Sequence, residues 1–193
     1  MNEEEFFYVS HGQYSDLRVL YSEEQIREKA REIAAEIEDF FPSDEPLYIV
    51  CVLKGGMLFC SDLIRCLKTP VQLEFVKVSS YGNEFHTKGD VKIIGGLPDV
   101  DNQNVLLVDD IVDTGYTANY LLDVFKTQFT PKRIKTAVLI NKLNNRRINI
   151  TPDFYGFDVD EEYLVGYGLD YVGFYRNLPY VGCFPKNTVN FGK

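Results

Sequence analysis

The feature that most constrains the fold is a repeated succession of an apolar segment, a polar turn and a helix-like segment. The apolar segment Leu47–Leu53 (LYIVCVL) is followed by the turn Lys-Gly-Gly and by a helix-like stretch at 57–67. The apolar segment 105–108 (VLLV) is likewise followed by a polar turn and by a helix-like stretch at 117–129. Short apolar runs bounded by turns are typical of strands buried on both faces, and strands that alternate with helices pair in parallel through crossover connections. The sequence therefore predicts an α/β fold, an open and mostly parallel sheet flanked by helices.

An amphipathic helix is expected ahead of this repeat. Ser22 and Gln25 have the spacing of a capping box, and Pro42 marks the end of the helix. Between them, apolar side chains recur at helical spacing, namely Ile26, Ala30, Ile33, Ile37 and Phe40. Further strands are expected at 71–79, 91–94 and 134–141.

The length of 193 residues fits a single domain covering 1–193. We expect its core at about 21–150. The Gly-, Asn- and Asp-rich stretch at 79–104 is interpreted as a mobile lid, with a plain hairpin excursion as the alternative. The aromatic and glycine-rich segment at about 151–193 is interpreted as a small hood packed over one edge of the sheet.

Charge and composition exclude several classes of protein. The net charge of −9 opposes non-specific attraction to a nucleic acid backbone, so no nucleic acid partner is expected. The longest apolar run, Leu47–Leu53, is far shorter than the roughly 20 residues of a membrane-spanning helix. The first ten residues (MNEEEFFYVS) have neither a basic leader nor an apolar core, so we expect a cytoplasmic protein without a signal peptide.

The cysteines have no spacing typical of a zinc site. No CxxC pair or Cys/His cluster occurs in the chain. We therefore expect four buried free thiols, Cys51, Cys60, Cys66 and Cys183.

Two polar turns follow predicted parallel strands and should lie at the same edge of the sheet. These are Lys-Gly-Gly after Leu47–Leu53 and the stretch 109–117 (DDIVDTGYT). In open α/β sheets, ligands bind beyond the carboxyl ends of the strands, near the point where the strand order reverses. Thr114, Gly115 and Thr117 could form an anion cradle at the N-terminus of the following helix.

The acidic stretch allows three interpretations. It could be a solvated strand end in which Asp113 or Thr114 simply caps the helix. It could be a DDxxD magnesium motif of the kind found in prenyl-diphosphate synthases, although that motif lies within a helix and VLLV predicts a strand. It could also be a sugar-phosphate loop, in which the carboxylates and the phosphate cradle have separate roles.

The residues then carry a specific resemblance. The segment 105–118 (VLLVDDIVDTGYTA) resembles the phosphoribosyl-diphosphate motif of type I phosphoribosyltransferases. Five further segments resemble, in order, parts of the hypoxanthine-guanine phosphoribosyltransferases: LKGG (53–56), SSYGN (79–83), LINK (139–142), PDFYGF (152–157) and YLVGYGLDYVGFYRNLPYVG (163–182).

That resemblance implies a purine salvage enzyme. Members of the family transfer a 5-phosphoribosyl group from 5-phosphoribosyl 1-diphosphate to a 6-oxopurine in the presence of Mg²⁺ and release diphosphate. By resemblance, Asp113 would accept the proton of purine N7, and Asp109 and Asp110 would contact the ribose hydroxyls directly or through Mg²⁺. The 5-phosphate would be bound by Thr114, Gly115, Tyr116 and Thr117.

Other residues take their roles from the same resemblance. Lys54 and Gly55, whose peptide bond can be cis in the family, would bind the diphosphate together with Arg176, and Asp170 would hold a second Mg²⁺. Lys142 would donate to the purine 6-oxo group, Tyr163 would stack on the ring, and the backbone of Leu164 would meet its edge. Ser80 and Tyr81 would form the tip of the lid. Relatives assemble, so we expect a homodimer or homotetramer.

Two points qualify the resemblance. Asp109 stands where the family commonly has Glu, so its carboxylate is one methylene shorter. The fold also serves regulators that bind nucleic acid without catalysis. Such a regulator is disfavoured because this chain is acidic and keeps Asp113, Lys142, Asp170 and Arg176.

Overall fold

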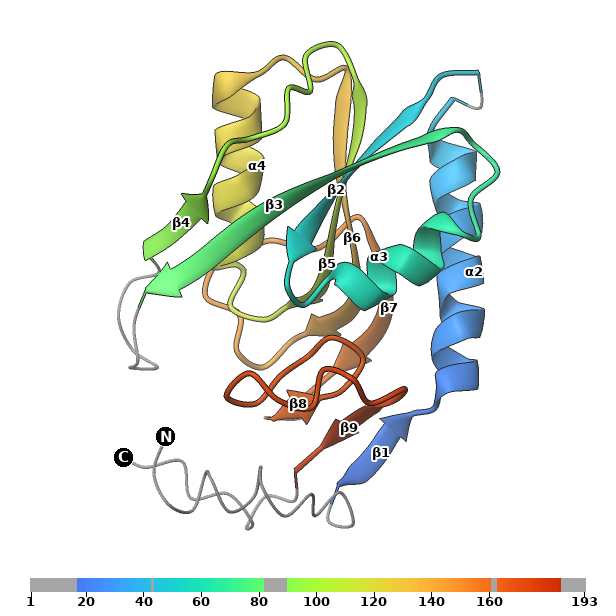
Figure 1. Ribbon diagram of the computed structural model, residues 1–193, viewed down its shortest axis with the longest axis vertical. Coiled ribbons are helices and arrows are strands. Elements are labelled where there is room, and N and C mark those ends of the chain that lie inside the picture. The colour runs from blue at the N-terminus through green and yellow to red at the C-terminus, as the bar shows by residue number, and fades with distance from the viewer. Residues whose placement is uncertain (1–16, 43, 82–89, 161–162, 185–193) are drawn as a thin grey trace.

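The structure, a computed structural model, describes residues 17–42, 44–81, 90–160 and 163–184. Its main sheet has six strands in the order β4-β3-β2-β5-β6-β7 (Figure 1). The strand bounds are β2 Leu47–Leu53, β3 Val71–Tyr81, β4 Asp90–Ile94, β5 Asn104–Val112, β6 Arg133–Lys142 and β7 Phe154–Val159. All neighbours pair in parallel except β3 and β4, which are antiparallel. The predicted α/β fold with an open, mostly parallel sheet is confirmed.

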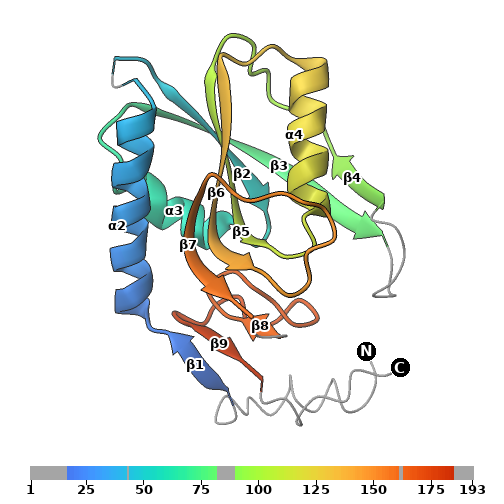
Figure 2. The same cartoon turned by 180° about the vertical axis from the view of Figure 1, so that it is seen from behind.

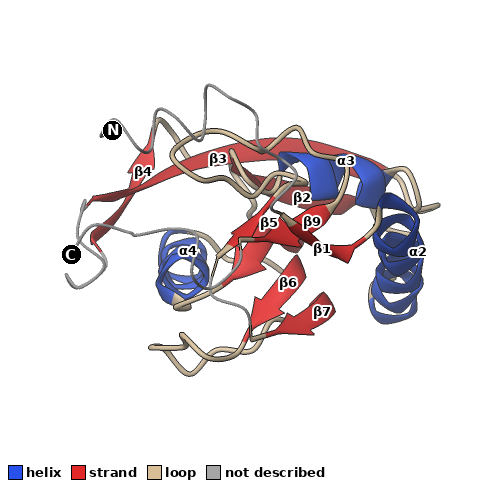
Figure 3. Ribbon diagram, turned by 90° about the horizontal axis from the view of Figure 1, so that it is seen from below, coloured by secondary structure: helices blue, strands red, loops and turns tan. Residues whose placement is uncertain are grey.

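Helices cover both faces of this sheet. The described helices are α2 Glu23–Phe40, α3 Met57–Ile64 and α4 Tyr116–Gln128. On β2, Ile49 and Cys51 pack with α2 and α3 in one apolar cluster, whereas Val50 and Val52 pack with α4 in another. Because successive side chains of a strand point to opposite faces, this alternation places α4 across the sheet from α2 and α3 (Figure 3).

The first helix begins and ends where its sequence predicts. Ser22 is the N-cap residue of α2, and its hydroxyl oxygen accepts a hydrogen bond from the main-chain N–H of Gln25. The Gln25 side chain in turn accepts from the main-chain N–H of Ser22, which completes the capping box. The helix ends at Phe40, two residues before Pro42. No helix in the described ranges combines the length and the apolar character that a membrane crossing requires.

The hood is a separate three-stranded antiparallel sheet built from both ends of the described chain. Its strands are β1 Arg18–Tyr21, β8 Leu164–Val165 and β9 Val181–Cys183, in the order β1-β9-β8. Figure 2 shows it beyond the carboxyl ends of the parallel strands. The predicted hood boundary at about 151 needs correction, because β7 pairs with β6 at the edge of the main sheet. The C-terminal part of the hood therefore begins after β7.

The predicted lid contains a hairpin. β3 and β4 pair antiparallel, with Tyr81 opposite Asp90. Residues 82–89, the middle of the predicted lid, lie outside the described residues, as do residues 1–16, where no signal peptide was expected.

Candidate functional site

Three strand ends meet at one edge of the sheet. β5 lies between β2 and β6 and is parallel to both, so the segments that follow these strands leave the sheet on the same side. The strand order reverses at the β2–β5 pair, because β3 and β4 lie beyond β2 while β6 and β7 lie beyond β5. This is the place where open α/β sheets bind ligands. Both polar turns singled out in the sequence lie there.

The turn after β2 lies directly against Asp110. A Cβ atom added to Gly55 would lie 2.0 Å from Oδ2 of Asp110, so no other residue fits there without displacing this carboxylate. Lys54 is exposed beside it. The cis peptide bond joins Leu53 to Lys54, one bond earlier than the Lys54–Gly55 bond that the resemblance indicated.

Asp109 and Asp110 lie within β5, because the strand continues to Val112 instead of ending at residue 108. Oδ1 of Asp109 accepts a hydrogen bond from the main-chain N–H of Asp110 at 2.9 Å. Burial raises the pKa of both carboxyl groups, and the charge of Asp110 raises the pKa of Asp109 further. The guanidinium of Arg176 opposes this rise in the pKa of Asp110. A cation bound at this pair would therefore stabilise the ionised form of both carboxyl groups.

The carboxylate pair fits a magnesium ion. In the described part of the chain, no group of three or more His, Cys, Asp and Glu residues could hold a metal ion. Magnesium does not need such a group, because it commonly binds through one or two carboxylates, several waters and the phosphates of a substrate. Asp109 and Asp110 offer the hard oxygen donors that such an ion prefers.

The turn after β5 forms a cradle at the start of α4. Gly115 is the N-cap residue of the helix and has a φ of +89°, a left-handed conformation that favours glycine. The main-chain N–H of Tyr116 lies 3.5 Å from Oγ1 of Thr114. The helix N-terminus adds free N–H groups and a partial positive charge, which together attract an anion. Thr114, Gly115, Tyr116 and Thr117 form this turn, and phosphate binding by them stays a prediction.

A loop after β6 supports this cradle, and sequence reasoning missed it. The main-chain N–H groups of Arg147 and Ile148 donate to the carbonyl oxygen of Thr114 at 2.9 and 3.0 Å. A Cβ atom on Gly115 would lie 2.8 Å from Cγ2 of Ile150. The sequence feature that could have indicated this loop is the polar segment LNNRR, which directly follows Lys142 at the predicted strand end.

Asp113 faces the end of β6. Its Oδ1 lies 3.5 Å from Nζ of Lys142, which is itself buried, and its Oδ2 accepts a hydrogen bond from Nδ2 of Asn145 at 3.2 Å. Within the described ranges, Oδ1 is buried without a hydrogen-bond donor. A buried acceptor that receives no hydrogen bond is costly. The site therefore offers one carboxylate oxygen to a donor from outside the protein.

The hood brings Arg176 and Asp170 to the same edge. Nη2 of Arg176 lies 2.5 Å from Oδ1 of Asp170, and its Nη1 donates to the carbonyl oxygen of Gly168. Gly168 has a φ of +97°, and a Cβ atom there would lie 2.1 Å from the carbonyl oxygen of Gly55. This contact fixes the hood against the turn after β2.

The remaining predicted residues occupy the hood and the hairpin. Leu164 is the first residue of β8 and is buried, and Tyr163, directly before it, packs with the apolar cluster of the hood. Ser80 and Tyr81 are the last two residues of β3.

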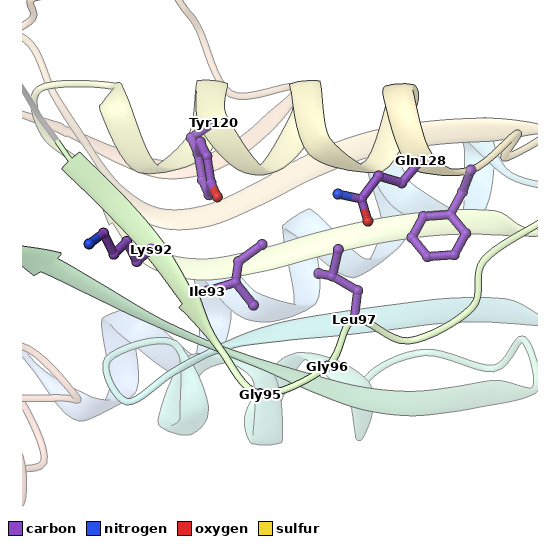
Figure 4. Close-up of a pocket in the computed structure, with 8 residues that line it drawn as sticks. Lys92, Ile93, Gly95, Gly96, Leu97, Tyr120 and Gln128 are labelled. Carbon is purple, nitrogen blue, oxygen red and sulfur yellow. The ribbon is translucent and has the colours of Figure 1, made fainter.

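A hollow elsewhere on the surface contains none of the predicted site residues. It lies between β4 and α4, as Figure 4 shows, and has a volume of about 540 Å³. Its lining combines a lysine with apolar and amide side chains and two glycines: Lys92, Ile93, Gly95, Gly96, Leu97, Tyr120, Gln128 and Phe129. The edge of the sheet is therefore the better candidate site.

Comparisons with known proteins show the family to which the chain is similar. Residues 19–171 match the phosphoribosyl transferase domain family. The chain is 43% identical over 166 residues to the hypoxanthine-guanine phosphoribosyltransferase of Bacillus subtilis, covering 86% of this chain and 91% of that protein. The corresponding protein of Aquifex aeolicus is 42% identical, with coverage of 86% and 93%. A crystal structure of the Staphylococcus aureus hypoxanthine phosphoribosyltransferase superposes with a TM-score of 0.84 at 34% identity, covering 90% of this chain and 95% of that one.

The close contact between Gly168 and Gly55 predicts a difference between two glycine substitutions. Gly168 and Gly173 both have a positive φ, but only at Gly168 would a Cβ atom meet another backbone; at Gly173 it would meet nothing within 4 Å. Gly173→Ala should lower the free energy of unfolding by about 1–2 kcal/mol through backbone strain. Gly168→Ala should cost about 1–3 kcal/mol more through overpacking. Urea unfolding measures both, and equal losses would contradict the contact.

Proposed function

Because the chain belongs to the phosphoribosyltransferase family, we propose that it transfers the 5-phosphoribosyl group of 5-phosphoribosyl 1-diphosphate to hypoxanthine or guanine in purine salvage. The observation that carries this proposal is the pair Asp113 and Lys142 beside the Thr114–Thr117 cradle. Asp113 offers a buried acceptor oxygen and Lys142 an ammonium group 3.5 Å from it. A 6-oxopurine has a complementary pair, the N7–H donor and the 6-oxo acceptor. The names of the relatives in Bacillus subtilis and Aquifex aeolicus agree with this substrate class.

The sugar diphosphate would lie across the strand ends. Thr114, Gly115, Tyr116 and Thr117 would bind the 5-phosphate, mainly through main-chain N–H groups at the start of α4. The leaving diphosphate would be held by Lys54, by the main chain of Gly55 and by the planar guanidinium of Arg176, which suits phosphate oxygens. The 5-phosphate and the diphosphate would then lie on opposite sides of C1′, the ribose carbon that reacts.

The carboxylates Asp109 and Asp110 would contact the ribose between these anions. They would accept hydrogen bonds from its hydroxyl groups or share Mg²⁺ with them. When bound, Mg²⁺ would neutralise the diphosphate and make it a better leaving group. Asp170 is the candidate for a second magnesium position. Asp109 is shorter than the usual Glu, so we expect it to reach the ribose through the ion or a water.

The reaction needs one bond made, one broken and one proton moved. The lone pair of purine N9 forms the bond to C1′ of the ribose, while the bond from C1′ to the diphosphate oxygen breaks and its electron pair leaves with diphosphate. The N7 proton passes to Oδ1 of Asp113, and the electron pair of the N7–H bond stays in the ring. Oδ1 is the better acceptor of the two oxygens, because Oδ2 already accepts from Asn145 at 3.2 Å.

The purine would be recognised by the end of β6 and the start of β8. Lys142 would donate to the 6-oxo group, Tyr163 would stack on the ring and the main chain of Leu164 would meet its pyrimidine edge. Adenine has an amino group in place of the 6-oxo group. Because this amino group is a donor, the Lys142 ammonium would have no acceptor to bind. Ser80 and Tyr81, at the end of β3, would belong to a lid that excludes water from the reacting sugar.

We also propose a cytoplasmic homo-oligomer, either a dimer or a tetramer. The structure pairs none of the four cysteines in a disulfide, in keeping with a reducing compartment. Large apolar side chains are exposed at several places, including Phe75, Val172 and Phe174, and could serve subunit contacts.

The proposed activity predicts a specific pattern of products. The purified protein, given Mg²⁺ and 5-phosphoribosyl 1-diphosphate, should form a nucleotide and diphosphate with hypoxanthine or guanine. The kcat/KM for adenine should be at least about 100-fold lower, because Lys142 finds no acceptor there. Removal of Mg²⁺ with a chelator should abolish product formation, and its return should restore it. Chromatographic detection of nucleotides measures the product formed with each base, with and without Mg²⁺. No nucleotide from any base, or equal use of adenine, would contradict the proposal.

The role of Asp113 predicts the effect of its isosteric substitution. Asp113→Asn should lower kcat by roughly 10²- to 10⁴-fold, the usual contribution of a general base, with the fold retained. Asp39→Asn is a matched control, because Asp39 is an exposed residue of α2 far along the chain from the site. Steady-state kinetics would measure both variants. Near-normal turnover of Asp113→Asn would contradict the assignment of Asp113 as the general base.

A further inference from the structure

Tyr167 belongs to the hood, but its side chain lies in the main core of the protein. The residue is 5% exposed and packs in the apolar cluster that α2 and α3 form with the main sheet. Tyr163 and Val165, just before it in the chain, pack in the separate cluster of the hood. Tyr167 therefore joins the hood to the main core, and the proposed reaction gives it no task.

The backbone around Tyr167 forms a tight turn. The main-chain N–H of Gly166 donates to the carbonyl oxygen of Leu169 at 3.0 Å, and the N–H of Leu169 donates back at 3.1 Å. Both central residues have a positive φ, +49° at Tyr167 and +97° at Gly168, as in a type I′ turn. Glycine adopts such a conformation readily, but a bulky aromatic residue rarely does. An interaction of the Tyr167 side chain is therefore expected to hold it there.

The hydroxyl group of Tyr167 makes that interaction. It donates a hydrogen bond to Oδ2 of Asp62 on helix α3. The other carboxylate oxygen, Oδ1, accepts from Nη1 of Arg65 at 3.3 Å, so the carboxylate is contacted from two sides. Burial and the hydrogen bond to Asp62 raise the pKa of Tyr167. The hydroxyl therefore keeps its proton and stays a donor to α3.

The same turn contacts both parts of the proposed diphosphate site. Gly168 follows Tyr167, and a Cβ atom there would lie 2.1 Å from the carbonyl oxygen of Gly55. The carbonyl oxygen of Gly168 accepts a hydrogen bond from Nη1 of Arg176. Helix α3, which carries Asp62, begins at Met57, directly after the turn that contains Gly55. The hydroxyl of Tyr167 thus joins the hood to the helix that continues from the diphosphate turn.

We infer that Tyr167 is a positioning residue for diphosphate binding: through Asp62 it holds the hood on α3, so that Arg176 stays opposite Lys54 and Gly55. This inference rests on the proposed function, because it takes these three residues as the diphosphate site. It assigns to Tyr167 no contact with either substrate. Without the hydroxyl, the hood and the turn would have to be ordered when diphosphate binds, and that ordering lowers affinity.

The rest of the substrate site depends less on this hydrogen bond. Leu164, proposed to meet the purine edge, is held in β8 by its pairing with Cys183 of β9. The cradle proposed for the 5-phosphate lies at the start of α4, on the other face of the sheet from α3. A nucleoside monophosphate carries the purine and the 5-phosphate but no diphosphate. Its binding should therefore respond less to loss of the hydroxyl than the binding of diphosphate.

The test measures binding of inorganic diphosphate and of guanosine 5′-monophosphate, each with Mg²⁺, by isothermal titration calorimetry. Tyr167→Phe removes only the hydroxyl. It should raise the Kd of diphosphate by about 10-fold, the lower end of what a hydrogen bond to a charged group contributes, and change the Kd of the monophosphate less. Asp62→Asn keeps an acceptor oxygen, so its diphosphate Kd should stay near that of the wild type. Tyr155→Phe alters an exposed tyrosine of β7 and should change neither Kd.

A double-mutant cycle tests whether the hydrogen bond itself carries the effect. Asp62→Ala removes the acceptor and should weaken diphosphate binding about as much as Tyr167→Phe does. In the Asp62→Ala background, Tyr167→Phe should then add little, because the interaction is already lost. Asp62→Ala also breaks the ion pair with Arg65. Arg65→Gln breaks that pair alone and should bind diphosphate as the wild type does, because the Arg65 side chain is exposed and such pairs are weak.

Several outcomes would overturn the positioning role. These are an unchanged diphosphate Kd in Tyr167→Phe, equal losses for diphosphate and the monophosphate, and additive effects in the cycle. Circular dichroism and thermal unfolding check that each variant is folded. If Tyr167→Phe does not fold, Asp62→Ala decides, because wild-type diphosphate binding in that variant would overturn the inference.

The failure of this inference differs from the failure of the proposed function. If the wild type forms nucleotide and binds diphosphate, and Tyr167→Phe binds diphosphate equally well, only the role of Tyr167 is contradicted. If the wild type forms no nucleotide with any base, the proposed function itself is contradicted.

Discussion

The parallel pairing of β5 with β2 on one side and β6 on the other is the constraint on which the site depends. It brings three segments far apart in the sequence, those following Leu53, Val112 and Lys142, to one edge of the sheet. The order of strands reverses at the β2–β5 pair, so the connections on either side diverge and leave room for a ligand. The carboxylates, the anion cradle and the buried lysine therefore lie at the same edge of the sheet.

Close contacts at two glycines hold the other parts of the site against this frame. Gly55 lies against Asp110, and Gly168 of the hood lies against Gly55, with no space for a side chain at either glycine. Arg176 donates to the carbonyl oxygen of Gly168 and pairs with Asp170. The hood, the turn after β2 and the acidic strand are therefore mechanically linked. A change in the position of any one of them should therefore displace the other two.

Periodicity and turn chemistry were sufficient to predict helix α2 and the main sheet apart from β7. Leu47–Leu53 is a strand with the predicted bounds, and the capping box of Ser22 and Gln25 forms as expected. The end of β5 was less predictable, because Asp109 and Asp110 are unusual in a strand. The hood boundary was placed too early because the short strand β7 has aromatic residues and a glycine like the hood itself. The contact of Asn145 with Asp113 could not be predicted, because it joins a loop to a residue 32 positions earlier through tertiary packing alone.

We propose that one edge of the sheet binds both substrates, with the purine between Asp113 and Lys142. The most direct measurement is a crystal structure of the protein with Mg²⁺, 5-phosphoribosyl 1-diphosphate and an unreactive 6-oxopurine analogue in which carbon replaces N9. We expect the 5-phosphate at Thr114–Thr117, the diphosphate at Lys54 and Gly55, and N7 within hydrogen-bond distance of Oδ1 of Asp113. A purine bound elsewhere, for example in the hollow between β4 and α4, or one whose N7 points away from Asp113, would contradict it.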